Sequence, residues 1–153
     1  MFLRAALFVV PVVLAGWVIG WFNIPGPWYE SLSKPAFNPP NWVFAPVWTI
    51  LYLIIGVVGW RVFGRTTDSR SGTGSLRALW GLQLLLNYAW SPAFFGLESA
   101  GLALVLISLL LATILAFILR ALPRDRLSAG LFIPYLAWVS FAALLNFEIW
   151  RLN

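Results

Sequence analysis

Five long stretches of this 153-residue chain contain no charged side chain, and each runs for 20 residues or more. They are residues 5–29, 35–60, 78–97, 99–119 and 127–147. An α-helix needs about 20 apolar residues to cross the roughly 30 Å hydrocarbon core of a membrane. Because lipid offers the backbone no hydrogen bonds, only helices or a closed barrel can span it, and the period-2 alternation of a barrel is absent.

The sequence therefore predicts an all-α membrane protein, with one five-transmembrane-helix domain over residues 1–153. The helices are expected near residues 4–22, 42–62, 77–96, 99–120 and 127–150. The first is expected to be retained rather than cleaved as a signal peptide, because its apolar run is too long and no A-x-A-like site follows it.

Composition excludes several other classes of protein. Charged residues make up 10% of the chain and hydrophobic residues 61%, with a mean hydropathy of +0.88. A soluble domain carries about 25% charged residues, so this chain is neither an ordinary soluble domain nor a disordered or nucleic-acid-binding one. Cys and His are absent, which removes thiolate chemistry and the commonest haem and zinc ligand. No metal site and no obligatory cofactor are predicted.

The basic residues predict the orientation of the chain. With five spans, the N-terminus and the loops at 61–77 and 120–126 share one side, which holds 8 of the 10 Lys and Arg residues. Basic loops favour the cytoplasm, so the N-terminus is predicted inside and the C-terminus outside. Residues 61–77 include the sequence GRTTDSRSGTG, which is typical of a flexible polar linker.

The segment at 23–41 differs from that linker. It reads NIPGPWYESLSKPAFNPPN and combines five Pro with three aromatic residues. Proline limits the conformations of a free loop, and the aromatic rings give the segment something to pack with. We expect an ordered Pro/Trp-rich loop between the first two long helices, with a helical turn around 27–33; the alternative is a plain connector.

Ten Trp residues raise the question of where each lies in the membrane. Six lie at predicted span ends, where Trp is common at membrane interfaces: Trp21, Trp28, Trp42, Trp60, Trp80 and Trp150. Trp48, Trp90 and Trp138 lie deeper, in the outer half to the middle of their spans, from a rise of about 1.5 Å per residue. At helical spacing they share faces with other residues, namely Tyr52, Gln83, Asn87, Phe94, Ala142 and Leu145.

Gln83 and Asn87 admit two interpretations. Buried amides are costly in lipid, so both must face the bundle interior. They serve either to hold helices together or to line a cavity, and the shared face with large aromatic residues favours the cavity. Gly16-x-x-x-Gly20 is a weak signal for a close-packing or dimer face.

Several ordered motifs resemble one family along nearly the whole chain. They are Trp28-Tyr29, Leu32-x-Lys34-Pro35, Pro39-Pro40, Trp42-x-Phe44-x-Pro46-x-Trp48-x-x-Leu51-Tyr52, Gln83-x-x-x-Asn87-x-x-Trp90-x-x-x-Phe94-Phe95, Pro134-Tyr135-x-x-Trp138 and Leu145-Asn146. The chain resembles bacterial-type members of the TspO/MBR family, the tryptophan-rich sensory proteins, which include the mitochondrial translocator protein (peripheral-type benzodiazepine receptor).

The resemblance implies a five-helix bundle, commonly a homodimer, that binds porphyrins such as protoporphyrin IX and haem, or similar flat hydrophobic ligands, below the first loop. Together the motifs and helical faces predict a site formed by Tyr29, Pro40, Phe44, Trp48, Tyr52, Gln83, Asn87, Trp90, Phe94, Trp138, Ala142 and Leu145. Lys34 is a candidate partner for the propionates of a porphyrin. Phe147 stands where the family's cholesterol motif has Tyr, which disfavours strong sterol binding.

A receptor or regulator that binds a porphyrin is the favoured function. The resemblance also implies two alternatives: light-dependent porphyrin degradation that uses Trp48 and Trp138, and passive translocation of tetrapyrrole or sterol-like ligands. Membrane lipid is the other expected partner. Coupled transport is disfavoured because the charges lie at span ends rather than inside the membrane.

Overall fold

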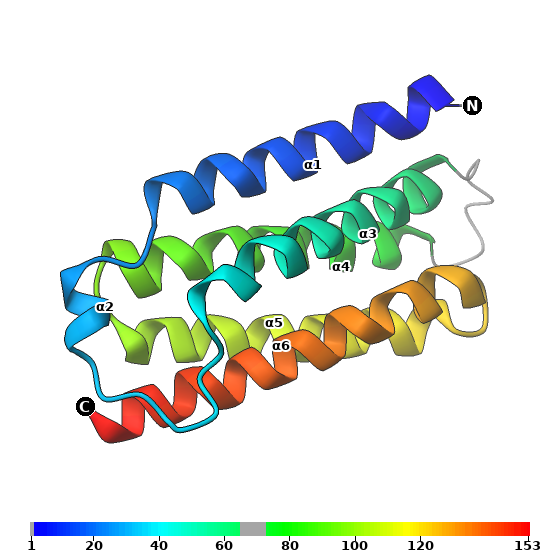
Figure 1. Ribbon diagram of the computed structural model, residues 1–153. Helices are drawn as coiled ribbons and strands as arrows, with labels where there is room; N and C mark the ends of the chain where they lie inside the picture. The colour runs from blue at the N-terminus through cyan, green and yellow to red at the C-terminus, as the bar shows by residue number, and fades with distance from the viewer. Residues whose placement is uncertain (1, 65–72) are drawn as a thin grey trace.

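The structure is a computed structural model that describes residues 2–64 and 73–153. Within those residues the chain is helical and has no strand. The elements are α1 (Phe2–Phe22), α2 (Pro27–Ser31), the 3-10 turn η1 (Asn41–Val43), α3 (Phe44–Gly64), α4 (Thr73–Ser91), the π-helical turn η2 (Pro92–Gly96), α5 (Ala100–Ala121) and α6 (Arg126–Leu152). The five long helices of the described chain, α1, α3, α4, α5 and α6, form one bundle (Figure 1), so the predicted all-α membrane fold is confirmed.

The long helices begin and end within five residues of the predicted bounds. The largest difference is at α4, which begins at Thr73, and whose continuation from Pro92 is a π-helical turn rather than α-helix. Proline has no N–H to donate and its ring crowds the preceding turn, which accounts for the change at this residue. Residues 65–72 of the predicted linker lie outside the described residues.

Four helices of the described chain are long and apolar enough to cross a membrane, over residues 5–22, 41–64, 100–121 and 126–152. The fifth long helix, α4, is less apolar because it carries Arg77, Gln83 and Asn87. Gln83 and Asn87 are 0% and 4% exposed, so their amides face the bundle interior as expected. The chain is an integral membrane protein.

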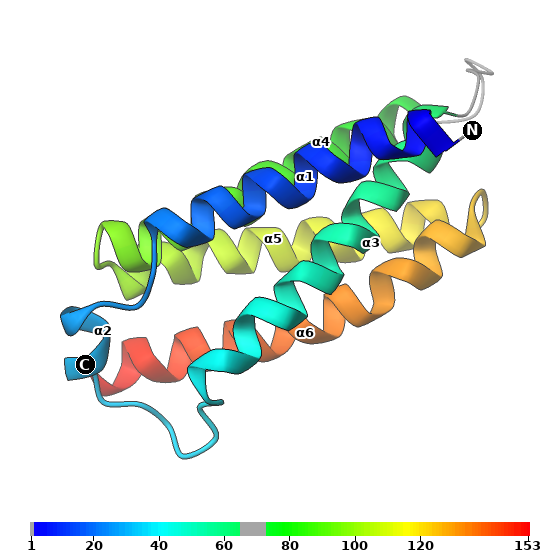
Figure 2. The ribbon, with the colours of Figure 1, turned by 45° about the horizontal axis from the view of Figure 1, so that its top comes forward.

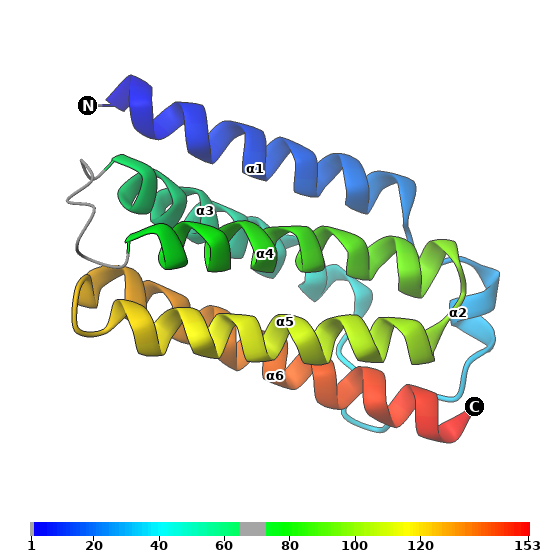
Figure 3. The same ribbon diagram turned by 180° about the vertical axis from the view of Figure 1, so that it is seen from behind.

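The two ends of the bundle differ in what they carry. The start of α1 and the turn between α5 and α6 lie at one end, whereas α2 and the C-terminus lie at the other (Figures 1 and 3). An odd number of long helices produces this arrangement. Which end faces the cytoplasm stays a prediction from the Arg and Lys residues.

Helix α1 packs mainly against α3, and in Figure 2 it passes in front of α4 at the edge of the bundle. Over residues 5–22 of α1, 11% of the residues are buried, against 33% in each of the other three apolar spans. Gly56 of α3 allows the close approach, because a Cβ at this position would lie 2.6 Å from Cα of Val9. Gly16 is likewise a close-packing position, since the Tyr52 ring fills the space beside it, whereas Gly20 has no atom within 4 Å of an added Cβ.

An ion pair fastens α3 to the start of α6. Nη2 of Arg61 donates to Oδ1 of Asp125 at 2.7 Å, and the Asp125 carboxylate also accepts from the backbone N–H and the hydroxyl of Ser128. Asp125 thereby caps the N-terminus of α6. Burial alone would raise the pKa of Asp125, but these hydrogen bonds outweigh it and hold the pKa at about 2.

The loop between α1 and α3 is ordered and contains α2 at the position where a helical turn was expected. The backbone N–H of Ser33 donates to Oδ1 of Asn153 at 2.9 Å, and Nδ2 of Asn153 donates to the Ser33 carbonyl at 3.0 Å. The Tyr29 hydroxyl donates to Oδ1 of Asn38, within the same loop. The loop is therefore attached to the C-terminal end of α6.

Candidate functional site

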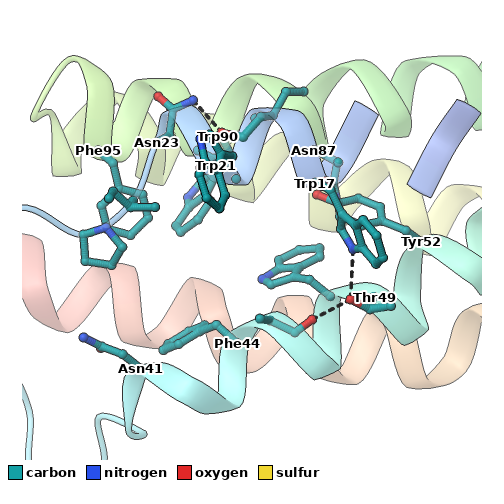
Figure 4. A pocket seen from close by; sticks show the side chains of 18 of the residues that line it. Trp17, Trp21, Asn23, Asn41, Phe44, Thr49, Tyr52, Asn87, Trp90 and Phe95 are labelled. Carbon is teal, nitrogen blue, oxygen red and sulfur yellow. Dashed lines mark hydrogen bonds between the residues drawn. The ribbon is translucent and has the colours of Figure 1, made fainter. Parts of the chain in front are cut away.

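A cavity of about 540 Å³ lies between α1, α3 and α4, with the α1–α3 loop at one end (Figure 4). This volume is in the range of about 300–1,000 Å³ that is typical of small-molecule sites. The lining residues are Gly16, Trp17, Ile19, Gly20, Trp21, Asn23, Ile24, Pro25, Tyr29, Asn41, Phe44, Ala45, Trp48, Thr49, Tyr52, Asn87, Trp90, Ser91 and Phe95. None of these lining residues, all from the described part of the chain, is charged.

The α1 and α3 walls are joined by one hydrogen bond across the cavity. Nε1 of Trp17 donates to Oγ1 of Thr49 at 3.1 Å, and the Thr49 hydroxyl donates to the carbonyl of Ala45 at 2.8 Å (Figure 4). Trp17 and Trp21 lie one helical turn apart on α1 and are 54% and 79% exposed. The α1 wall is therefore also the part of the cavity nearest the surrounding lipid.

Aromatic rings make up much of the α3 and α4 walls. Trp48 stacks on Tyr52, with ring centroids 5.7 Å apart and an interplanar angle of 30°. On the α4 side, Trp90 stacks on Phe94 at 5.2 Å and meets Phe95 edge-on at 6.0 Å. The rings of Trp48 and Trp90 thus come from different helices and both line one cavity.

The floor of the cavity, which we define as Tyr52 and Asn87, is polar. The Tyr52 hydroxyl donates to Oδ1 of Asn87 at 3.2 Å. Nδ2 of Asn87 donates to the hydroxyl of Tyr135 at 2.7 Å, and that hydroxyl donates to Oε1 of Gln83 at 2.9 Å. Gln83 and Asn87 therefore both take part in hydrogen bonds between helices. Asn87 also lines the cavity, whereas Gln83 lies behind it.

A second buried amide holds the Trp90 ring. Nε1 of Trp90 donates to Oδ1 of Asn146 at 3.0 Å, and Nδ2 of Asn146 donates to the carbonyl of Ala100 at 2.9 Å. Asn146 is 1% exposed, so the acceptor end of this bond is shielded from water and lipid. It joins α4 to α6 and fixes the orientation of Trp90 in the wall.

The end of the cavity near the loop contains Tyr29, whose ring also contacts Lys34. Burial raises the pKa of the Tyr29 phenol, which keeps it protonated as a donor to Asn38. Nζ of Lys34 lies 4.5 Å from the Tyr29 ring centroid and donates to the carbonyls of Glu30 and Leu32. Lys34 itself does not line the cavity.

Six of the twelve predicted site residues line the cavity. They are Tyr29, Phe44, Trp48, Tyr52, Asn87 and Trp90. The other six lie elsewhere: Pro40, Gln83, Phe94, Trp138, Ala142 and Leu145. Pro40 is exposed in the loop, whereas Ala142 and Leu145 are buried in the hydrophobic core.

Trp138 does not line the cavity, but its ring contacts Phe44, which does. The two ring centroids are 6.1 Å apart in an edge-on arrangement, and Trp138 also packs against Phe141 at 5.5 Å. Its buried Nε1 has no hydrogen-bond partner among the described residues. Phe94, which is 2% exposed, supports Trp90 and Tyr29 from behind rather than lining the cavity.

Sequence reasoning missed the contribution of α1. Trp21 was interpreted as an interface residue, and the glycine pair of α1 as a packing or dimer motif. The spacing of Trp17, Gly20 and Trp21 beside Gly16 was the available signal, but a lipid-facing helix also carries exposed Trp.

The residues 2–64 and 73–153 contain no group of three or more His, Cys, Asp or Glu that could hold a metal.

Comparison with known proteins identifies the family of this chain. The family model described as TspO/MBR family matches residues 7–151. The chain belongs to the TspO/MBR family. It is 36% identical to protein CrtK of Rhodobacter capsulatus over 148 residues, which cover 97% of this chain and 91% of that protein.

Two further TspO/MBR relatives come from distant organisms. The tryptophan-rich protein TspO of Chlorobaculum tepidum is 42% identical over 130 residues, covering 84% of this chain and 82% of that protein. The human translocator protein is 38% identical over 129 residues, covering 82% of this chain and 75% of that protein. Membership of this family supports a membrane receptor or regulator as the general function.

Proposed function

We propose that this TspO/MBR protein is a membrane receptor that binds a flat hydrophobic ligand of the porphyrin type in the cavity between α1, α3 and α4. The observation that carries the proposal is the composition of the walls. Aromatic rings from three helices surround a space of about 540 Å³, and no charged residue of the described chain lines it. A flat conjugated ring is the chemistry that such walls complement.

Stacking provides the affinity in this proposal. An aromatic contact adds about 0.5–1.5 kcal/mol beyond the burial of area, and Trp48 and Trp90 offer faces from opposite helices. Both rings are held in place, Trp48 by Tyr52 and Trp90 by Asn146. Fixed rings lose little conformational entropy when a ligand binds, which favours affinity.

The carboxylates of a porphyrin have to leave the cavity, because no cation in the described lining pairs with them. Lys34 remains the proposed partner, since its ammonium lies over Tyr29 at the loop end. The exposed α1 wall, with Trp17 and Trp21, is the proposed entrance for a ligand dissolved in the bilayer.

Titration of the detergent-purified protein with protoporphyrin IX, followed by Trp fluorescence, tests the proposal. We expect saturable quenching in the wild type and roughly tenfold weaker binding in Trp48→Ala, about the loss of one stacking contact of 1.4 kcal/mol. Trp42→Ala is the matched control, because Trp42 is 74% exposed and does not line the cavity.

Gly20→Phe gives an independent test by filling the cavity. An added Cβ at Gly20 meets no atom within 4 Å, although Gly20 lines the cavity. We therefore expect a folded protein that binds protoporphyrin IX weakly. Linear quenching that ignores Trp48→Ala and Gly20→Phe would overturn the proposal.

The alternatives are tested by illumination and transport assays on the same preparation. Light-dependent degradation requires bleaching of bound porphyrin to a defined product that depends on Trp48 and Trp138. Trp48 lines the cavity, whereas Trp138 contacts Phe44 and does not line it, so only Trp48 of this pair borders the proposed ligand. Homodimer formation, contact with sterol and an N-terminus on the cytoplasmic side remain proposals.

A further inference from the structure

A chain of hydrogen bonds runs from the cavity floor into the core of the bundle, and every bond points in the same direction. Tyr52 donates to Asn87, Asn87 to Tyr135, and Tyr135 to Gln83, at 3.2, 2.7 and 2.9 Å. Nε2 of Gln83 then donates to the backbone carbonyl of Trp80 at 2.9 Å. We call this series the floor relay.

The inner end of the floor relay fixes its direction. A carbonyl oxygen can only accept, so Gln83 must turn its amino group to Trp80 and its Oε1 to Tyr135. The Tyr135 hydroxyl then donates to Gln83 and accepts from Asn87. Gln83 and Tyr135 are 0% exposed, so a reversed bond would leave buried polar atoms unpaired without water to replace the partner.

This direction determines which atoms the floor offers a ligand. The amino group of Asn87 is turned to Tyr135, which does not line the cavity, and its Oδ1 is turned to Tyr52. The hydroxyl proton of Tyr52 is committed to Asn87. On the side of Asn87 that is turned to Tyr52, acceptor capacity remains on two oxygens, Oη of Tyr52 and Oδ1 of Asn87.

Other donors in the walls are mostly engaged as well. The indole N–H of Trp90 is bonded to Asn146, that of Trp17 to Thr49, and the hydroxyl of Tyr29 to Asn38.

Trp21 and Trp48 are the exceptions among these aromatic donors, because neither indole N–H is hydrogen-bonded to another described residue. Trp21 belongs to the α1 wall, whereas Trp48 belongs to the α3 wall, one helical turn from the floor. The cavity therefore offers donors on its walls and acceptors at the floor.

We propose that Gln83 and Tyr135 determine ligand specificity as positioning residues, because they fix Asn87 and Tyr52 so that the cavity selects a flat ligand whose innermost edge carries an N–H or O–H donor. This inference rests on the proposed function, that the cavity binds a flat ligand. Ligands that present only a carbonyl or ether oxygen at that edge face two acceptor oxygens and are disfavoured.

Three tricyclic probes of nearly equal shape test the proposal on the full chain. Carbazole carries an N–H donor, dibenzofuran carries an oxygen acceptor and fluorene carries neither. Calorimetric titration of the detergent-purified wild type is expected to show carbazole binding about tenfold more tightly than dibenzofuran. Carbazole donates one hydrogen bond to a floor oxygen, whereas the oxygen of dibenzofuran faces another acceptor and makes none.

Two variants change the relay without touching the ligand. In Tyr135→Phe, the Asn87 amide is free to adopt either orientation, so the ratio of the two dissociation constants is expected to fall to about one. In Gln83→Met, the Tyr135 hydroxyl donates to Asn87 instead, the Asn87 amide turns over, and the freed Tyr52 hydroxyl donates into the cavity. Dibenzofuran is then expected to bind more tightly than carbazole.

Tyr88→Phe is the matched control. Its hydroxyl donates to the carbonyl of Val12 at 2.7 Å, outside the floor relay and outside the lining, so the preference for carbazole should persist. A general loss of packing would weaken all three probes together and leave their ratios unchanged.

The outcomes separate this inference from the proposed function. If the probes bind, are weakened by Gly20→Phe and show the same preference in wild type, Tyr135→Phe and Gln83→Met, the inference is wrong and the cavity still binds flat ligands. If no probe binds the wild type while protoporphyrin IX does, the inference alone is overturned; if protoporphyrin IX does not bind either, both are overturned. Should one variant fail to fold, the other decides, because each predicts its own change of ratio.

Discussion

Replacing Gly56 by Ala separates two opposing effects on the stability of the bundle. Alanine is favoured over glycine inside a helix by about 1 kcal/mol. The new Cβ would, however, lie 2.6 Å from Cα of Val9 and 3.1–3.2 Å from two atoms of its side chain. Carbon atoms pack best about 3.5–4.0 Å apart, so α1 must move away by about 1 Å.

Gly81→Ala isolates the packing contribution. Gly81 lies within α4, is exposed and has no atom within 4 Å of an added Cβ, so its substitution gains the helix preference alone. Overpacking costs about 1–3 kcal/mol. The free energy of unfolding of the Gly56 variant should therefore be lower than that of the Gly81 variant by this amount.

Thermal unfolding in one detergent, followed by near-UV circular dichroism, measures the difference. At about 2–4 °C per kcal/mol for a chain of this size, the two midpoints should differ by at least about 2 °C, with Gly81→Ala above wild type. Protoporphyrin IX affinity should fall in Gly56→Ala because α1 carries one wall of the cavity. Equal midpoints for both variants would refute the argument that backbone contact at Gly56 holds α1.

Three other predictions concern polar contacts at the two ends of the bundle and beside the cavity. The folded pKa of Asp125, about 2, lies below its ordinary value of 3.8, so its contribution of about 2 kcal/mol is complete above about pH 5 and is lost as the pH falls toward 2; Asp125→Asn should abolish that part of the pH dependence of unfolding, and an unchanged profile would contradict it. Asn153→Ala removes both hydrogen bonds to Ser33, and limited proteolysis should cut the α1–α3 loop faster than in wild type; equal rates would count against the attachment. Asn146→Leu leaves the buried N–H of Trp90 without its partner, which should cost about 1–3 kcal/mol of stability in a chemical denaturation and shift the Trp emission; a neutral result would mean that this amide does not hold the ring.

Much of the fold follows from the charge-free runs. Lipid forces the backbone into helices, so the positions of the charges already limit where helices end. The inward orientation of Gln83 and Asn87 was predictable for the same reason, since an amide facing lipid has no partner. The loop containing α2 was predictable from its prolines and aromatic rings.

The walls of the cavity were less predictable, because they depend on which helices approach one another. Trp48 and Trp138 both lie within long apolar helices, but Trp48 lines the cavity, whereas Trp138 packs edge-on against Phe44 and does not line it. Helical periodicity identifies a face and not the neighbour that covers it. Trp17 shows the same limit, since an indole exposed to lipid and one beside a cavity leave the same pattern.

The exposure of α1 has a consequence for how affinities of this protein are measured. Where Trp17 and Trp21 border the cavity at 54% and 79% exposure, the surrounding acyl chains or detergent tails act as a further wall, and one of them can enter when no ligand is present. Ligand binding is then an exchange reaction with the amphiphile. The apparent dissociation constant is expected to vary with chain length and saturation of the lipid, even when the protein itself is unchanged.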